Sequence, residues 1–190
     1  NLGTGLTASS IAAGGNHTCA LLNNGQIKCW GANNFGQLGI ETTANKGSAF
    51  SHMGDNLTAV ELGTDTTAKS IAVGRYHSCA ILADGSVKCW GLNTSGQLGQ
   101  GSITNQGDNA NEMGDNLPVI DLGTSKIAKS ITAGFYHTCA LLNDSKIKCW
   151  GAASDGQLGQ PLVDSLGSNT GQMGDVLPNV DIGKGIAAYA

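Results

Sequence analysis

A 60-residue repeat constrains the fold of this chain more than any other feature. The segment His17–Gly39 recurs from His77 and again from His137, and Cys19, Cys79 and Cys139 stand 60 residues apart. A period of this size indicates a repeat architecture, in which each unit buries its apolar faces against its neighbours. The units are 1–60, 61–120 and 121–180. Residues 181–190 repeat the opening ten residues, and we expect them to add an edge strand.

The sequence predicts an all-β fold with four short antiparallel strands in each unit. The third set of four strands begins just before the third unit, and we expect its strands at Leu117–Leu122, Ser130–Ala133, His137–Leu142 and Lys146–Trp150. Glycines separate these runs, and no apolar run continues at helical spacing. Runs such as CALL, without strict alternation, are typical of strands covered on both faces.

A tight hairpin is the strongest local signal in each unit. Asn23-Asn24-Gly25 suits a three-residue loop with glycine in the left-handed position. Counting outward pairs Leu21 with Ile27 and places Cys19 directly opposite Cys29. The same count predicts disulfides within each unit: Cys19–Cys29, Cys79–Cys89 and Cys139–Cys149. In the third unit Ser145 replaces the loop glycine, so we expect strain there.

Composition excludes several classes of function. The net charge is −4 and the ten Lys and Arg residues form no run, which argues against a nucleic-acid partner. No stretch approaches the roughly 20 apolar residues of a membrane-spanning helix. Six cysteines in matched pairs favour disulfides and an oxidising compartment, so we expect a secreted or cell-surface protein.

The order A-x-G-x-x-H, CAL-type strand, turn, KCWG and GQLG resembles the regulator of chromosome condensation repeat. The resemblance covers essentially the whole chain and implies β-propeller blades, each a four-stranded antiparallel sheet. It does not imply the nucleotide-exchange and chromatin-binding functions of the best-known member, because the repeat motif is the blade scaffold. The cysteine pair resembles the extracellular branch of the family.

The recurring polar residues admit two interpretations. His17, His77 and His137 each share a strand face with a cysteine and offer a zinc-ligand set, or they hold a backbone carbonyl beside a disulfide. Since all three units repeat them, we favour scaffold and expect no enzyme, no catalytic residue, no metal and no cofactor. A calcium site in one acidic loop is a weaker alternative, with the ligands Asp108, Asn109, Glu112, Asp115 and Asn116.

Other repeated residues have structural explanations. We expect Asp55, Asp115 and Asp175 to brace a loop before the next strand. Trp30, Trp90 and Trp150 either plug the gap between adjacent blades, which we favour, or stack on Lys28, Lys88 and Lys148. Four Asn-x-Ser/Thr sequons are candidate glycosylation sites, with the first two expected in exposed turns: Asn93, Asn143, Asn56 and Asn16.

Three blades do not close a ring, because propellers have four or more. The two end faces therefore remain open, join further copies in a ring or filament, or meet further blades of a longer chain. Two functions follow, both through protein contacts. One is a structural assembly subunit built from open blade faces. The other is a recognition module using the loops Asn33–Asn56, Asn93–Asn116 and Ser154–Asp175, where Phe35 and Phe50 are the candidate contact residues.

Overall fold

Three antiparallel sheets form the fold. A computed structural model describes residues 1–161, 164–183 and 188. The first sheet contains β1 (Ala8–Ala13), β2 (His17–Leu22) and β3 (Ile27–Gly31). The second contains β4 (Ala68–Val73), β5 (His77–Leu82) and β6 (Val87–Gly91). The third contains β7 (Ala128–Ala133), β8 (His137–Leu142), β9 (Ile147–Ala152) and β10 (Ser165–Leu166).

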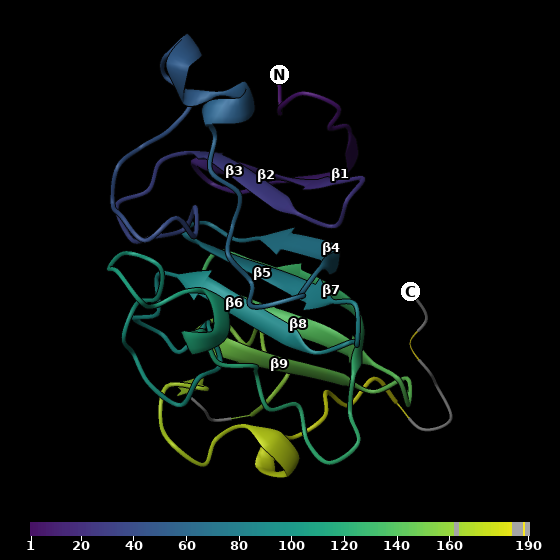
Figure 1. Cartoon of the computed structure of the whole chain (residues 1–190). Coiled ribbons are helices and arrows are strands. Elements are labelled where there is room, and N and C mark those ends of the chain that lie inside the picture. Colours follow the sequence, from purple (N-terminus) through teal and green to yellow (C-terminus); the bar gives the residue numbers. More distant parts are fainter. Residues whose placement is uncertain (162–163, 184–187, 189–190) are drawn as a thin grey trace.

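The sheets stack one above the other in chain order, as Figure 1 shows. β4 packs against β1 and β2, and β7 packs against β4 and β5. One buried apolar cluster fills each of the two junctions, with Trp90 in the first and Trp150 in the second. The sheets are therefore propeller-type blades, called blades 1, 2 and 3 below, and the all-β prediction is confirmed.

The strand count of the prediction needs correction. The segment 117–122 is extended but forms no strand, and its Ile120 amide donates to the Val87 carbonyl at 2.8 Å. It therefore lies along the outer edge of blade 2, not in blade 3. The rest of that edge is one bridge, between Gly91 and Gln106, which becomes the short strand β10 in blade 3. A fourth strand is thus reduced to fragments.

Short 3-10 turns lie in the long connections after each blade. They span Phe50–His52, Gly54–Asn56, Gly114–Asn116 and Gly174–Val176. Of the predicted fourth edge strand at 181–190, residues 184–187, 189 and 190 lie outside the described residues, and 181–183 form no strand. The Ala188 amide lies 3.5 Å from the Ser145 carbonyl, the pairing that Ala128 makes with Gly85 one unit earlier.

The hairpin register is as predicted. Leu21 pairs with Ile27 and Cys19 with Cys29, and the other two units repeat the pattern. The sulfur atoms of the three pairs lie 2.08, 2.11 and 2.10 Å apart, at disulfide distance. Each covalent link closes one hairpin across neighbouring strands of its own blade.

Ser145 occupies the left-handed region, with φ of 64°, where Gly25 and Gly85 have φ of 80° and 91°. A side chain meets a steric penalty in this region that glycine does not. We expect Ser145→Gly to raise the free energy of unfolding by about 1 kcal/mol, measured by urea denaturation. Ser125, also left-handed at φ of 59°, offers a second test through Ser125→Gly. Destabilisation by both substitutions would contradict the strain argument.

Candidate protein-interaction surfaces

A hydrogen-bonded relay joins each blade to the next. At the first junction, the Ser78 hydroxyl and the Trp90 indole N–H both donate to the Gln37 carbonyl, at 2.9 and 3.1 Å. The His17 Nε2 lies 2.8 Å from the same Ser78 oxygen. Because the serine proton is directed to the carbonyl, Nε2 of His17 must carry a proton and donate it. Its Nδ1 is buried without a hydrogen-bond partner among the described residues, which disfavours a second proton, so the histidine is the neutral Nε2–H tautomer.

The second junction repeats this relay 60 residues later. Thr138 and Trp150 donate to the Gln97 carbonyl at 2.9 and 3.0 Å, and His77 Nε2 lies 2.9 Å from the threonine hydroxyl. Burial lowers the pKa of His17 to about 4 and that of His77 to about 3. These histidines therefore join blades, which supports the scaffold interpretation of the recurring His residues.

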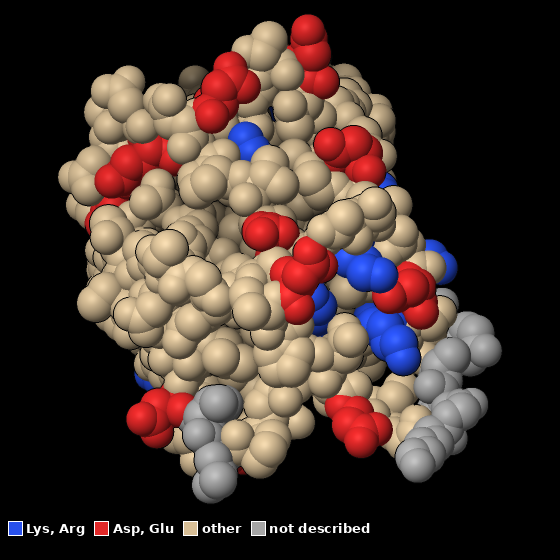
Figure 2. Space-filling view, turned by 90° about the horizontal axis from the view of Figure 1, so that it is seen from below, with Lys and Arg blue, Asp and Glu red and all other residues tan. Residues whose placement is uncertain are grey.

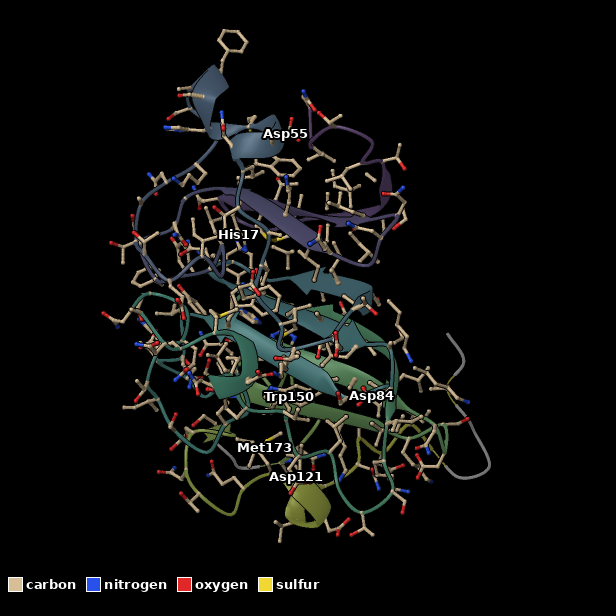
Figure 3. All side chains as sticks on the ribbon, viewed as in Figure 1. His17, Asp55, Asp84, Asp121, Trp150 and Met173 are labelled. Carbon is tan, nitrogen blue, oxygen red and sulfur yellow. A yellow bond between two sulfur atoms is a disulfide. The ribbon has the colours of Figure 1, made fainter. Side chains whose placement is uncertain are left out.

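The tryptophans plug the gaps between blades, as predicted. Trp90 and Trp150 are completely buried, and Figure 3 shows Trp150 within the stack. A Cβ at Gly99 would lie 2.7 Å from the indole nitrogen of Trp150, so this close approach requires glycine. Trp30 differs from the other two because no blade of the described chain precedes it, and it stays partly exposed.

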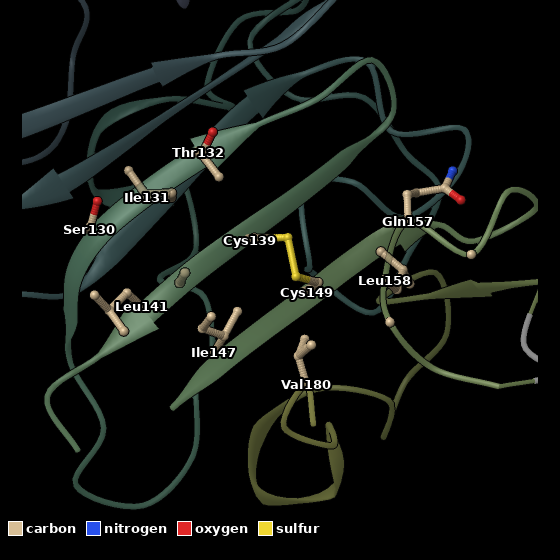
Figure 4. A pocket seen from close by; sticks show the side chains of 13 residues that line it. Ser130, Ile131, Thr132, Cys139, Leu141, Ile147, Cys149, Gln157, Leu158 and Val180 are labelled. Atoms are coloured by element: carbon tan, nitrogen blue, oxygen red, sulfur yellow. A yellow bond between two sulfur atoms is a disulfide. The ribbon is translucent and has the colours of Figure 1, made fainter. Parts of the chain in front are cut away.

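Blade 3 presents an open face with a cavity of about 470 Å³. Figure 4 shows its floor, with side chains of β7, β8 and β9 around the central disulfide. Leu158, Gly159 and Val180 line one side. At the closed junctions, the glycines equivalent to Gly159 contact the tryptophan of the next blade. The cavity therefore lies where a further blade would insert its tryptophan.

The end of the molecule formed by blade 3 presents both uncharged and charged residues. Figure 2 views the molecule from this end and shows mostly uncharged residues, with Asp and Glu scattered and Lys toward one side. At the other end of the stack, blade 1 exposes Ile11, which is 66 % accessible, beside the partly exposed Thr18 and Trp30. Both end faces thus present apolar surface to solvent.

The alternative that tryptophan stacks on lysine, which the sequence left open but did not favour, is wrong. Lys28, Lys88 and Lys148 are buried, and each ammonium donates to two backbone carbonyls of its own unit. For Lys88 these are the Leu62 and Gly114 carbonyls, both at 2.8 Å. Backbone carbonyls therefore provide the hydrogen bonds that a buried lysine ammonium needs.

The aspartates of the Met-Gly-Asp motif brace a loop, although a different loop from the one expected. The carboxylate of Asp55 accepts bonds from the amide and hydroxyl of Thr4, at 2.7 and 2.8 Å, in the segment before the first strand of its own blade. Figure 3 shows Asp55 close to this N-terminal segment. Asp115 and Asp175 bind Thr64 and Thr124 in the same way. These bonds lower the pKa of all three carboxyls.

The acidic loop of unit 2 also binds its own backbone. One carboxylate oxygen of Glu112 accepts the amides of Gly107, Asp108 and Asn109 at 2.9–3.0 Å. Within the described part of the chain, no group of three or more His, Cys, Asp and Glu side chains is arranged to hold a metal ion. The zinc alternative also requires free cysteine thiolates, whereas all six cysteines are paired.

One sequon lies elsewhere than predicted. Asn93 is completely buried, and its side-chain amide donates to the Ser102 and Thr104 carbonyls at 2.8 and 3.0 Å. The prediction of an exposed Asn93 is therefore wrong, and a glycan on that nitrogen would require these hydrogen bonds to break. The asparagines of the other three sequons, Asn16, Asn56 and Asn143, are exposed. Asn143 lies at the hairpin loop of blade 3.

The two candidate aromatic residues differ in their surroundings. Phe50 is fully exposed on its 3-10 turn, whereas Phe35 packs edge-on against Tyr76, with ring centroids 5.2 Å apart. Tyr76 also belongs to a group with Arg75, Phe135 and Tyr136, and the sequence patterns do not predict this group. Together with Phe35, these residues come from three different units, and nothing in the linear sequence links them.

Comparison with known proteins decides the family. The regulator of chromosome condensation (RCC1) repeat matches residues 24–81 and 84–141, and a second form of the same repeat matches 8–37, 68–97 and 128–157. The chain belongs to this repeat family. The matched ranges cover the three hairpins, the first two GQLG segments and the first two residues of the third, in agreement with the resemblance seen in the sequence.

Individual relatives support the assignment. The chain is 32 % identical over 162 residues to Protein pim1 of Schizosaccharomyces pombe, covering 80 % of this chain and 28 % of that protein. It is 33 % identical over 150 residues to the X-linked retinitis pigmentosa GTPase regulator homolog of Caenorhabditis elegans, covering 79 % and 10 %. The chain thus spans less than a third of the length of either relative.

Among solved structures, Prp20p from Saccharomyces cerevisiae matches with a TM-score of 0.66 at 22 % identity, covering 92 % of this chain and 38 % of that one. Human WBSCR16 matches with a TM-score of 0.63 at 19 % identity, covering 87 % and 37 %. These similarities establish the fold. No helix among the described residues is long and apolar enough to cross a membrane.

Proposed function

We propose that this repeat protein is non-enzymatic and acts through protein contacts made by its two open blade faces, as a secreted or cell-surface assembly subunit. The single observation that carries the proposal is the complementarity of these faces. Each presents one half of the relay that joins blades inside the chain. The three cysteine pairs support the extracellular location, because such bonds persist in oxidising compartments.

Blade 3 offers the accepting half of a junction. Its His137 is only partly buried, unlike the equivalent His77. Gln157, whose equivalents Gln37 and Gln97 accept two bonds each across a junction, lines the open cavity. Apolar side chains form most of that cavity, so covering it would remove apolar area from water.

Blade 1 offers the donating half. Thr18 and Trp30 occupy the positions of Thr138 and Trp150, which donate the two hydrogen bonds to the Gln97 carbonyl at the second junction. A second copy placed in the same register would put the Trp30 ring into the cavity and the Thr18 hydroxyl between His137 and the Gln157 carbonyl. Such a head-to-tail contact is heterologous, so it generates closed rings or filaments.

The test is the size and shape of the non-reduced protein, by light scattering with negative-stain images of the same fractions. We expect rings of two or three chains, or filaments. Val180→Arg would place a charge in the cavity, and we expect it to weaken association at least 10-fold. The matched control is Val176→Arg, on a side chain that is 70 % exposed outside the cavity. Wild-type protein that remains monomeric would refute the assembly proposal.

Recognition of a different protein is the second candidate. Prp20p has binding properties toward Gsp1p and histones, so partner binding by a relative supports this alternative. The observation that favours it here is the packing of Phe35 with Tyr76 at the loop surface. A monomeric wild-type chain that binds a partner, unaffected by Val180→Arg, would favour recognition over assembly.

A further inference from the structure

The only arginine of the chain lies among aromatic rings. The guanidinium carbon of Arg75 is 4.9 Å from the centroid of Tyr76, 5.2 Å from that of Phe135 and 5.9 Å from that of Tyr136. Phe35 extends the group through its contact with Tyr76. These five residues, called the Arg75 cluster below, include two of the three phenylalanines and two of the three tyrosines.

The Arg75 cluster breaks the repeat at one place. Its members Arg75-Tyr76 and Phe135-Tyr136 follow the first strands of blades 2 and 3, where blade 1 has Gly15-Asn16. The scaffold residues, in contrast, recur in all three units. Tyr76 and Tyr136 are equivalent, but the residue before them is Arg75 in one unit and Phe135 in the other. The repeated scaffold therefore does not require arginine at this position, which leaves Arg75 available for a further role.

Part of the Arg75 cluster is open to solvent. Phe135 is 65 % exposed, and the other four members are partly exposed. Arg75 donates one hydrogen bond, from Nη1 to the Tyr136 hydroxyl at 3.3 Å. It makes no ion pair within the described residues, where Lys126 with Asp144 forms the one salt bridge. The rings hold the guanidinium in place while it keeps unused donors.

This combination defines the chemistry of a partner. Guanidinium presents parallel N–H donors that match a carboxylate in two-pronged geometry. Tyrosine and arginine are enriched among the residues that contribute most to binding at protein interfaces, and side chains that are already held in place lose less entropy on binding. Arg75 is the one arginine among the ten basic residues of the chain, so it is the one side chain that offers a carboxylate this paired-donor geometry.

We propose that the Arg75 cluster binds a segment of a partner protein that carries an Asp or Glu carboxylate next to an aromatic side chain. The carboxylate pairs with the free edge of the Arg75 guanidinium. The aromatic side chain packs on Phe135 and Tyr136. This contact uses the turns between first and second strands, so it is separate from the open blade faces and does not depend on assembly.

The test is an NMR titration of the full chain with the peptide acetyl-Gly-Glu-Phe-Gly-amide. We expect shift changes centred on residues 74–76 and 134–136, and at least 5-fold weaker binding when Gln replaces Glu in the peptide. Arg75→Gln should weaken binding of the Glu peptide about 10-fold, to the level of the Gln peptide. Arg75→Lys, which keeps the charge without the planar fork, should fall between wild type and Arg75→Gln.

Controls separate binding from folding. Lys129→Gln removes an exposed cation outside the cluster and should leave the affinity unchanged, and urea denaturation verifies that each variant is folded. Equal affinity for the Glu and Gln peptides, or no effect of Arg75→Gln in a folded variant, would overturn the proposal. Displacement of the peptide by inorganic phosphate at lower concentration than by acetate would also overturn it, since the site would then prefer phosphate.

Discussion

Replacing Trp90 with alanine is expected to lower the free energy of unfolding by about 3–5 kcal/mol, the range for a fully buried tryptophan. Trp90 is completely buried between blades 1 and 2, and its indole N–H donates to the Gln37 carbonyl. Alanine would leave a cavity between the blades and remove one of the two bonds to that carbonyl. Urea denaturation of the non-reduced protein measures the change.

The repeat supplies the matched control. Trp30→Ala makes the same substitution at the equivalent position of blade 1, where no preceding blade of the described chain covers the ring. Measured at concentrations that keep the chain monomeric, its effect should be less than half that of Trp90→Ala. Equal losses at the two positions would show that tryptophan stabilises each blade from within, and the junction argument would fail.

Lowering the pH from 7 to 5 is expected to destabilise the fold by about 4 kcal/mol, about 2 kcal/mol from each of two buried histidines. Burial lowers the pKa of His17 to about 4 and of His77 to about 3, from the ordinary 6.5. Between pH 6.5 and these values the unfolded chain binds protons that the folded chain does not. Stability is therefore complete above pH 6.5 and falls progressively below it.

The relay explains why protonation is so unfavourable. Nε2 of His77 already donates to Thr138, and Nδ1 is buried without a hydrogen-bond partner among the described residues. A second proton would place a charged, unpaired N–H in the junction. The Asp55, Asp115 and Asp175 carboxyls have a pKa lowered from the ordinary 3.8, so they are ionised at pH 5 in both the folded and the unfolded chain and do not contribute to a loss between pH 6.5 and 5.

Urea denaturation at several pH values measures this dependence. His77→Gln removes one titrating group, and the stability lost between pH 6.5 and 5 should fall to about half of the wild-type loss. The matched control is His52→Gln, because His52 lies in a 3-10 turn outside the junctions. An unchanged pH dependence in His77→Gln would show that other groups cause the destabilisation.

Local rules made the blade interior predictable. The register of β2 with β3, the opposition of Cys19 and Cys29 and the left-handed Ser145 all depend on a three-residue loop and on strand alternation. These relations span about ten residues, well within one hairpin. The repeat applies the same hairpin three times, and the order of its motifs is sufficient to indicate the family.

The outer strand was less predictable. The segment 117–122 has the apolar residues of a strand, yet it makes one ladder bond to blade 2 and forms no strand in blade 3. Sequence order does not say which neighbouring sheet an edge segment joins. Likewise, the turn-like sequence around Asn93 suggested exposure, but three backbone groups of its own loop enclose the side chain.

By itself, therefore, the sequence determined the repeat, the hairpins, the cysteine pairing and the family. Only the tertiary structure decided what equivalent residues do, because identical side chains have different neighbours in different blades. Trp90 is sealed within a junction while Trp30 faces solvent, and His77 joins two blades while His137 lines an open face. The Arg75 cluster, too, exists only because stacking brings residues 35, 75 and 135 together.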